Sequence, residues 1–257
     1  PKVLLRAEAM LNLGRLDEAE KLLGKAPATT DGDATTDLLA ARLRLAKGDL
    51  AGAKATVDRA LAKSPESVPG CLLAAQVAMA SGLPDEAERA AHKALDLSPG
   101  NVAAQLMLAE IDFRRGRLEE AQKQALAIRE QAPASIPASY LLANIQAARG
   151  QYADADRTLR QISDAIRNFP PALLLSGSVK ARVGQLAQAQ DLLAHYVSLV
   201  PDNRNARRLL AAVQLDAGQP RVAADTLASL AGPETQDAAS LQLFGSAQLR
   251  TGELKGA

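Results

Sequence analysis

The chain has 257 residues, 47% of them hydrophobic but only 2% aromatic, and it contains no tryptophan. Its hydrophobic residues are mostly alanine and leucine, which favour helices, so a core built around large rings is excluded. The formal net charge of +1 excludes a general nucleic-acid binder, which carries a basic surplus on one face. The single cysteine, Cys71, excludes an internal disulfide framework and a cysteine-based metal cluster.

The sequence shows neither a membrane span nor a targeting segment. No apolar run reaches the roughly 18–20 residues that a membrane-spanning helix needs. The chain opens at Pro1 with no initiator methionine and no apolar signal segment. We therefore expect a fragment of a longer protein, with any targeting signal or lipid anchor upstream of residue 1.

Small residues recur along the chain with a period of 34 residues. The period is clearest for glycine, which lies at Gly14, Gly48, Gly82, Gly116, Gly150, Gly184, Gly218 and Gly252. An alanine follows each glycine by five residues, at Ala19, Ala53, Ala87, Ala121, Ala155, Ala189, Ala223 and Ala257. A very small residue precedes each glycine by seven, beginning with Ala7. Three such marks in register over eight copies indicate a repeat protein.

Each copy predicts one antiparallel pair of helices. A glycine suits the end of the first helix, where the chain turns left-handed and a Cβ would clash. The small residues around it let two helices approach closely. The second helix begins two residues after the glycine and ends before Pro65, Pro99, Pro133 or Pro201 in four copies. We expect one array with repeats at residues 1–33, 34–67, 68–101, 102–135, 136–169, 170–203, 204–237 and, in part, 238–257.

This pattern resembles the tetratricopeptide repeat over the whole chain. The most similar copy reads Gly116-Arg117-Leu118-Glu119-Glu120-Ala121, with Pro133 closing it. The resemblance implies an all-α, right-handed superhelical solenoid of 34-residue helix hairpins. Such an array is stabilised by contacts between neighbouring repeats in place of one central core.

Two departures from the family pattern concern the first helices and the repeat ends. The family often has an aromatic residue four before the glycine, whereas here the apolar residue comes three before it. This suggests a first helix rotated or slipped by one residue. The closing proline is replaced in the first, fifth and seventh repeats by Asp31, Arg167 and Thr235. We expect irregular loops at residues 26–33 and 232–237.

One face of the first helices is the candidate surface for a partner. A row of large apolar residues, from Leu5 to Leu243, is expected to pack between helices. By the resemblance, neighbouring rows line the inner, concave surface. Their members include Arg42, Leu72, Gln76, Leu106, Glu110, Arg114, Tyr140, Asn144, Leu174, Arg182 and Arg208. An apolar ladder edged by polar groups suits an extended or helical peptide, and spaced arginines suit carboxylates. The alternative is that the leucines pack between repeats and the arginines form a solvated surface.

The residues needed for catalysis are scarce. His92 and His195, the only histidines, lie about three repeats apart, and the glycines come singly, so no triad, metal site or phosphate loop is predicted. Acidic pairs such as Glu119 and Glu120 fall in the first turn of a second helix, where they stabilise the helix dipole. We expect a protein that binds other proteins or peptides, with no enzymatic activity and no cofactor.

A second, narrower resemblance comes from the later repeats. The segments at residues 171–177, 205–212 and 218–220 are similar to those of the large repeat lipoproteins that accompany exosortase/PEP-CTERM sorting and exopolysaccharide loci in Gram-negative bacteria. This resemblance implies a periplasmic or envelope-associated scaffold. Two other hypotheses stay open: a cytosolic adaptor that captures peptide tails, and a regulatory segment of an enzyme whose catalytic domain lies outside residues 1–257.

Overall fold

The structure is a computed structural model that describes residues 2–25, 34–167, 169–228, 230 and 238–251. These residues form sixteen helices and no strand. The helices are α1 (Lys2–Asn12), α2 (Leu16–Leu23), α3 (Ala34–Ala46), α4 (Leu50–Lys63), α5 (Val68–Ala80), α6 (Pro84–Leu97), α7 (Val102–Arg114), α8 (Leu118–Gln131), α9 (Ile136–Ala148), α10 (Tyr152–Arg160), α11 (Ser163–Ile166), α12 (Pro170–Arg182), α13 (Leu186–Leu199), α14 (Arg204–Asp216), α15 (Pro220–Ala228) and α16 (Ala238–Thr251).

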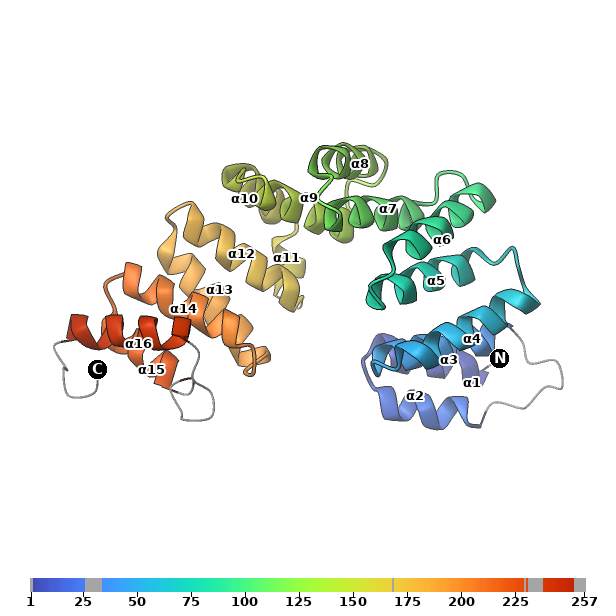
Figure 1. The fold of residues 1–257 in the computed structure, drawn as a ribbon, viewed down its shortest axis with the longest axis horizontal. Coiled ribbons are helices and arrows are strands. Elements are labelled where there is room, and N and C mark those ends of the chain that lie inside the picture. Colours follow the sequence, from blue (N-terminus) through green and yellow to red (C-terminus); the bar gives the residue numbers. More distant parts are fainter. Residues whose placement is uncertain (1, 26–33, 168, 229, 231–237, 252–257) are drawn as a thin grey trace. The chain divides into compact units, whose positions relative to one another are not determined.

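Helices pack as hairpins, namely α1 with α2, α3 with α4, α5 with α6, α7 with α8, α9 with α10, α12 with α13 and α14 with α15 (Figure 1). Each hairpin also packs against the next within two compact units, Pro1–Pro133 and Ala134–Ala257. We call these the N-terminal unit and the C-terminal unit and describe each by itself. The predicted all-α stack of hairpins is therefore confirmed. That residues 1–257 form one continuous array stays a prediction.

The hairpin turns are built by the recurrent glycines. Seven of the eight, from Gly14 to Gly218, have φ between 70° and 79°, while Gly252 lies outside the described residues. The N–H of Gly150 donates a hydrogen bond to the carbonyl of Ala147 at 3.0 Å, and the N–H of Gln151 donates one to the carbonyl of Gln146 at 2.8 Å. The same pair of bonds recurs at the other six turns and satisfies carbonyls that the helix end would leave free. Every turn therefore ends its first helix and redirects the chain in the same way.

The small residues bury themselves where the two helices of a hairpin meet. The alanines five after each glycine, from Ala19 to Ala223, are all 0% exposed, and Ala257 lies outside the described residues. So are the alanines seven before the glycine, such as Ala143. In the sixth repeat this position is Gly177, where a Cβ would lie only 2.6 Å from Cγ of Leu193. Close helix approach therefore requires small residues in both rows.

Four first helices begin at a capping side chain, and four second helices are followed by a proline. Side-chain oxygens of Ser67, Asn101, Ser135 and Asn203 accept a backbone N–H at the starts of α5, α7, α9 and α14. The second helices followed by Pro65, Pro99, Pro133 or Pro201 each run for 14 residues. Those of the first, fifth and seventh repeats, which lack that proline, run for 8 or 9 residues. The loops predicted at residues 26–33 and 232–237 lie outside the described residues.

The fifth repeat breaks its second helix in two. Helix α10 ends at Arg160, and the short α11 follows after Gln161 and Ile162. Both Ile162 and Ile166 are buried in one hydrophobic cluster, with Phe169 packed against it. Ile162 is equivalent to the buried Ile128 of the fourth repeat, so the break keeps a buried apolar residue at a position that is also buried in the continuous α8.

The row four before the glycine faces the second helix of its own repeat in the fourth, fifth and seventh repeats, so the suggested slip by one residue is not observed there. In three repeats a polar residue here bonds across the hairpin, each time at 2.8 Å: Asp112 with Gln124, Gln146 with Thr158, and Gln214 with Thr226. The row three before the glycine is mostly half-buried. Polar pairs thus replace the aromatic residue that the family often has there, and the register of the helix is kept.

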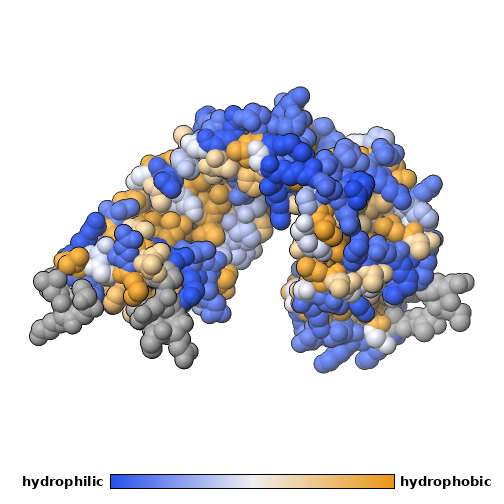
Figure 2. Space-filling model, in the orientation of Figure 1, coloured by the Kyte–Doolittle hydropathy of each residue, from blue (hydrophilic) through white to orange (hydrophobic). Residues whose placement is uncertain are grey.

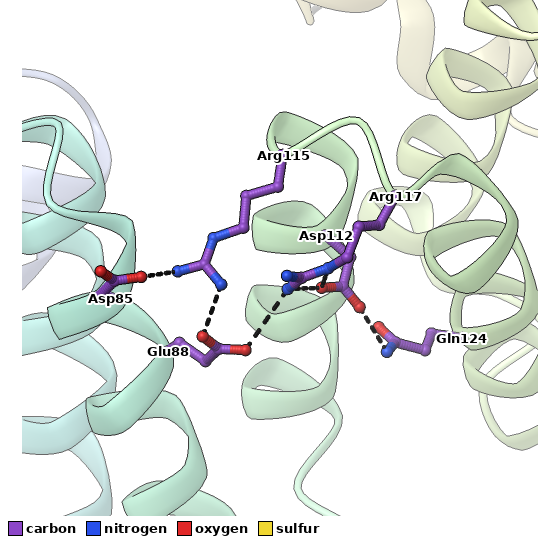
Figure 3. Close-up of polar contacts among 6 residues, drawn as sticks. All are labelled: Asp85, Glu88, Asp112, Arg115, Arg117 and Gln124. Carbon is purple, nitrogen blue, oxygen red and sulfur yellow. Dashed lines mark hydrogen bonds and ion pairs between the residues drawn. The ribbon is translucent and has the colours of Figure 1, made fainter.

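One of these polar residues belongs to a wider network between the third and fourth repeats (Figure 3). Asp112 accepts a hydrogen bond from Nε of Arg117 at 2.8 Å, and Arg117 also lies 3.5 Å from Glu88 of α6. Arg115 pairs with Glu88 at 2.7 Å and with Asp85. The network joins α6 to the turn between α7 and α8. The surface over α8 is mainly hydrophilic in Figure 2.

Candidate partner-binding groove

A groove of about 1020 Å³ runs along the first helices of the first three repeats, within the N-terminal unit. Glu8 of α1, Leu38 and Arg42 of α3, and Leu72 and Gln76 of α5 line it. They belong to two rows of equivalent positions, spaced by 34 residues, of which one presents leucines and the other presents polar side chains to the groove. The turn between α4 and α5 forms one edge, through residues 64–67 and Pro69.

Two charged side chains in the groove, Arg42 and Glu8, are paired with each other. Arg42 donates a hydrogen bond to Asn12 at 2.8 Å and lies 3.3 Å from the Glu8 carboxylate. Leu38 and Leu72 are half-buried, so each packs into its repeat and still offers apolar surface. The two interpretations made from the sequence, packing between repeats and contact with a partner, are therefore both compatible with the positions of these leucines. The groove offers apolar contact flanked by hydrogen-bonding groups.

Helix α3, which carries Leu38 and Arg42, is held at its start by a buried carboxylate. Asp37 pairs with Arg59 at 2.6 Å and with Lys63 at 2.8 Å, both on α4. Burial by itself would raise the pKa of the Asp37 carboxyl, but hydrogen bonds from the two cations outweigh it and hold that pKa below its ordinary value. Asp37 is thus ionised at neutral pH and ties α3 to α4 beside the groove.

The fourth repeat places its predicted residues outside this groove. Leu106 and Glu110 are half-buried on α7, and Arg114 is exposed. Arg114 pairs with Glu110 at 2.7 Å, one turn earlier in the same helix. Such an exposed pair contributes little to stability.

The C-terminal unit holds the remaining predicted residues in separate contacts. Tyr140 meets the ring of Phe169 edge-on at 5.0 Å, and Asn144 donates a hydrogen bond to the Tyr140 carbonyl at 3.0 Å. Leu174 is half-buried against two hydrophobic clusters. Arg182 lies over the ring of Tyr152 at 5.7 Å, a cation–π arrangement, and Arg208 donates a hydrogen bond to Asn205. The structure therefore gathers Arg42, Leu72 and Gln76 into one groove and does not bring the other predicted residues to it.

Sequence reasoning missed the edge of the groove formed by the turn at residues 64–67. Its signal was present, because Pro65 closes α4 and Ser67 caps α5 through the N–H of Gly70 at 3.1 Å. From the sequence, Pro65 was assigned only to ending a helix and Ser67 was assigned no role, because their place in the wall depends on how the two hairpins pack.

The described residues contain no arrangement suited to catalysis by a metal or a reactive thiol. No group of three or more His, Cys, Asp or Glu side chains within these ranges could hold a metal ion. Cys71 is buried, which raises the pKa of its thiol and keeps it protonated. His92 and His195 are exposed. In the described part of the chain, no helix is long and apolar enough to span a bilayer.

Comparison with solved structures finds the same architecture at low sequence identity. The Cut9–Hcn1 hetero-tetramer of the APC/C matches 95% of this chain with a TM-score of 0.81 at 16% identity. This chain spans about half, 48%, of the length of that one. PilW, a type IV pilus biogenesis factor, matches 82% of this chain and 97% of its own with a TM-score of 0.69 at 19% identity. Pseudomonas aeruginosa PilF matches 83% of this chain and 97% of its own with a TM-score of 0.69 at 16% identity. No curated protein sequence matches the chain significantly.

Sequence models of the tetratricopeptide repeat match residues 3–25, 44–91, 78–137 and 137–161. Together these matches span more than half of the 257 residues. They fall on the hairpins whose turns are made by the recurrent glycines and whose helices meet at the buried alanines. The chain belongs to the tetratricopeptide repeat family.

Proposed function

We propose that this chain is a non-catalytic scaffold that binds an extended peptide segment of a partner protein in the groove of α1, α3 and α5. The observation that carries the proposal is the groove itself, where equivalent positions of three successive repeats present apolar and hydrogen-bonding side chains side by side. The fold supports a role in protein–protein interaction, because stacked hairpins offer a long surface and no convergent reactive groups.

The spacing of the helices favours a particular kind of segment. Helices α3 and α5 pack against each other, and packed helices lie about 8–10 Å apart. In a polyproline II segment the side chains return to the same side every three residues, a rise of about 9 Å. A segment with apolar residues at every third position would therefore reach Leu38 and Leu72 with successive side chains, while Gln76 and Arg42 bond its backbone.

The test is selection from a random-peptide phage library, with the groove blocked in a variant. Gln76 is exposed and lines the groove, so Gln76→Trp fills the groove with little expected cost to folding. The matched control is Lys123→Trp on α8, which is also exposed and lies outside the groove. We expect selected peptides to bind the wild type and the control alike and the Gln76 variant about tenfold more weakly or worse. Equal binding to all three proteins would remove the groove as the site.

We further propose that this scaffold works in the Gram-negative cell envelope, in protein sorting or in exopolysaccharide production and export. Support comes from the segments at residues 171–177, 205–212 and 218–220, whose sequences are similar to those of repeat lipoproteins that accompany exosortase/PEP-CTERM sorting. A pull-down from an envelope fraction, repeated with the Gln76→Trp variant, should recover an envelope protein with the wild type only. Recovery of the protein and its partner from the cytosolic fraction would favour the cytosolic adaptor instead.

A further inference from the structure

A second cavity, of about 450 Å³, opens in the C-terminal unit where the second helix of the fifth repeat breaks. It lies between α10 and α11 on one side and α12 and α13 on the other. Ser163, Ile166 and Arg167, which form or follow the short α11, line it directly. None of its lining residues belongs to the partner-facing rows predicted from the sequence, so it is separate from the proposed peptide groove.

Two polar groups at this cavity have unused hydrogen-bonding capacity. The hydroxyl oxygen of Ser176 is buried, in a side chain only 4% exposed, and has no partner among the residues that the structure describes. An unpaired buried hydroxyl destabilises a fold, because it has lost its bonds to water without a replacement, so its presence calls for an explanation. Lys180, 12% exposed, bonds to Asp156 at 2.8 Å and to Gln185 at 2.6 Å. An ammonium group carries three N–H donors, so one remains after these two bonds within the described part of the chain.

The charge of the cavity favours an anion. Its lining contains three cations, Arg160, Arg167 and Lys180, against the single carboxylate of Asp156. Asp156 is already shared between Lys180 and Arg160, whose Nε lies 3.0 Å from it. An incoming anion would therefore meet a net positive site and would not have to displace an acceptor from either cation.

The apolar part of the lining limits what kind of anion fits. Leu159 and Ile166 are buried and Leu192 is half-buried. They leave an apolar surface that a bare inorganic ion would not cover. At about 30 Å³ for each water-sized group, the volume holds on the order of 10–15 non-hydrogen atoms.

We propose that this cavity binds a small organic carboxylate attached to an apolar group. The two carboxylate oxygens accept the remaining N–H of Lys180 and the hydroxyl of Ser176, and Arg167 adds long-range attraction at the rim. The apolar tail covers Leu159, Ile166 and Leu192. The cavity lies at the break between α10 and α11, where Ser163, Ile166 and Arg167 line it.

The experiment is calorimetric titration of the full chain with 4-phenylbutyrate, with octanoate as a second acid and 4-phenylbutyramide as the matched neutral compound. We expect saturable binding of at least one acid, and binding of the amide about tenfold weaker or undetectable, since the neutral amide brings no negative charge to the hydrogen bond from Lys180. No saturable binding of either acid at millimolar concentration, or equal binding of acid and amide, would overturn the proposal.

Variants locate the site and separate this proposal from the peptide groove. Arg167→Glu should weaken the acid about tenfold, whereas Arg221→Glu, an exposed arginine of α15 outside the cavity, should leave it unchanged. Ser176→Ala should weaken the acid severalfold and, because it removes an unpaired buried hydroxyl, should raise the unfolding midpoint of the unliganded protein. Gln76→Trp should not affect the acid. Unchanged binding in both Arg167→Glu and Ser176→Ala would place the ligand elsewhere.

Discussion

The regular hairpins of residues 34–131 and the fifth repeat share every turn and contact mark but differ in the second helix. Helices α4, α6 and α8 each run for 14 residues, whereas α10 runs for 9 and is followed by the four-residue α11. The glycine turns that open these second helices have nearly the same φ, 79° at Gly48, 76° at Gly116 and 75° at Gly150. A hairpin can therefore keep its start while its end changes.

The turn that starts the second helix depends on contacts between residues close in sequence, whereas the end of that helix depends also on contacts with other repeats. A turn is closed by two backbone bonds within six residues, so a single glycine suffices to set it. The end of the second helix depends also on what it packs against, since Ile162 and Ile166 enter a cluster that includes Leu173 of α12 and Tyr196 of α13. The same repeat loses a cap, because Phe169 occupies the position at which Ser67, Asn101, Ser135 and Asn203 cap other first helices. Pro170 and Pro171, which follow Phe169, have no N–H to leave unsatisfied, and this limits the cost of the missing cap.

The largest expected effect on the free energy of unfolding comes from replacing a buried alanine by a larger residue, in a regular hairpin and in the fifth repeat. Ala121→Leu in α8 and Ala155→Leu in α10 should each lower the free energy of unfolding by about 1–3 kcal/mol, because each alanine is 0% exposed. The loss should be larger at Ala121, since the continuous α8 can shift less than the short α10. Urea unfolding midpoints measure both, with the exposed Ala153→Leu of α10 as control. Full tolerance at either site would contradict close helix contact there.

A smaller and equal effect is expected at the turns, where the two regions agree. Gly116→Ala and Gly150→Ala should each cost about 1–2 kcal/mol, because an L-residue is strained in the left-handed region. A Cβ at either position would meet no described atom within 4 Å, so the cost is that of the backbone alone. Gly24→Ala is the control, since Gly24 has φ of −66°. A marked difference between Gly116 and Gly150 would show that the broken helix also alters its turn.

For the unaltered protein, a change of pH near neutrality should have the smallest effect on stability, and a loss of stability should appear only in acid, through one buried carboxylate in each region. Asp37 and Asp156 each pair with two cations, and these hydrogen bonds outweigh burial and hold the pKa of each carboxyl below its ordinary value. A lowered folded-state pKa stabilises the protein above the unfolded-state pKa of about 4, and the stabilisation is lost as pH falls through the folded-state value. The urea midpoint of unfolding should therefore be steady near pH 7 and should decrease once the pH is lower than about 4.

The variants Asp37→Asn and Asp156→Asn test that assignment. Each removes one titrating group, so each should flatten the acid dependence of the midpoint, besides lowering it at pH 7 by leaving two cations without their anion. An acid dependence unchanged in both variants would show that other carboxylates cause the loss. A change in Asp156→Asn alone would place the acid-sensitive contact in the fifth repeat.

The groove could be predicted in part. Arg42, Leu72 and Gln76 were identified because the resemblance places their rows on the inner face, and period-34 rows repeat the same environment. The pairing of Arg42 with Glu8 and Asn12 depends on side chains 34 and 30 residues away in the chain. Tyr140 and Phe169 likewise meet through packing that no local pattern encodes.

The sequence alone determined the period, the glycine turns, the starts of the second helices and the buried alanine rows. These follow from properties of single residues and their near neighbours: a backbone free to turn left-handed, a side chain small enough for close approach, and a ring that lacks an N–H. Only the tertiary structure decided that polar residues fill the row facing the second helix, that α10 breaks before α11, and that a cavity with an unpaired hydroxyl lies beside the break. Those features depend on which side chains from neighbouring hairpins share one desolvated space, and that is set by packing over distances the local pattern does not reach.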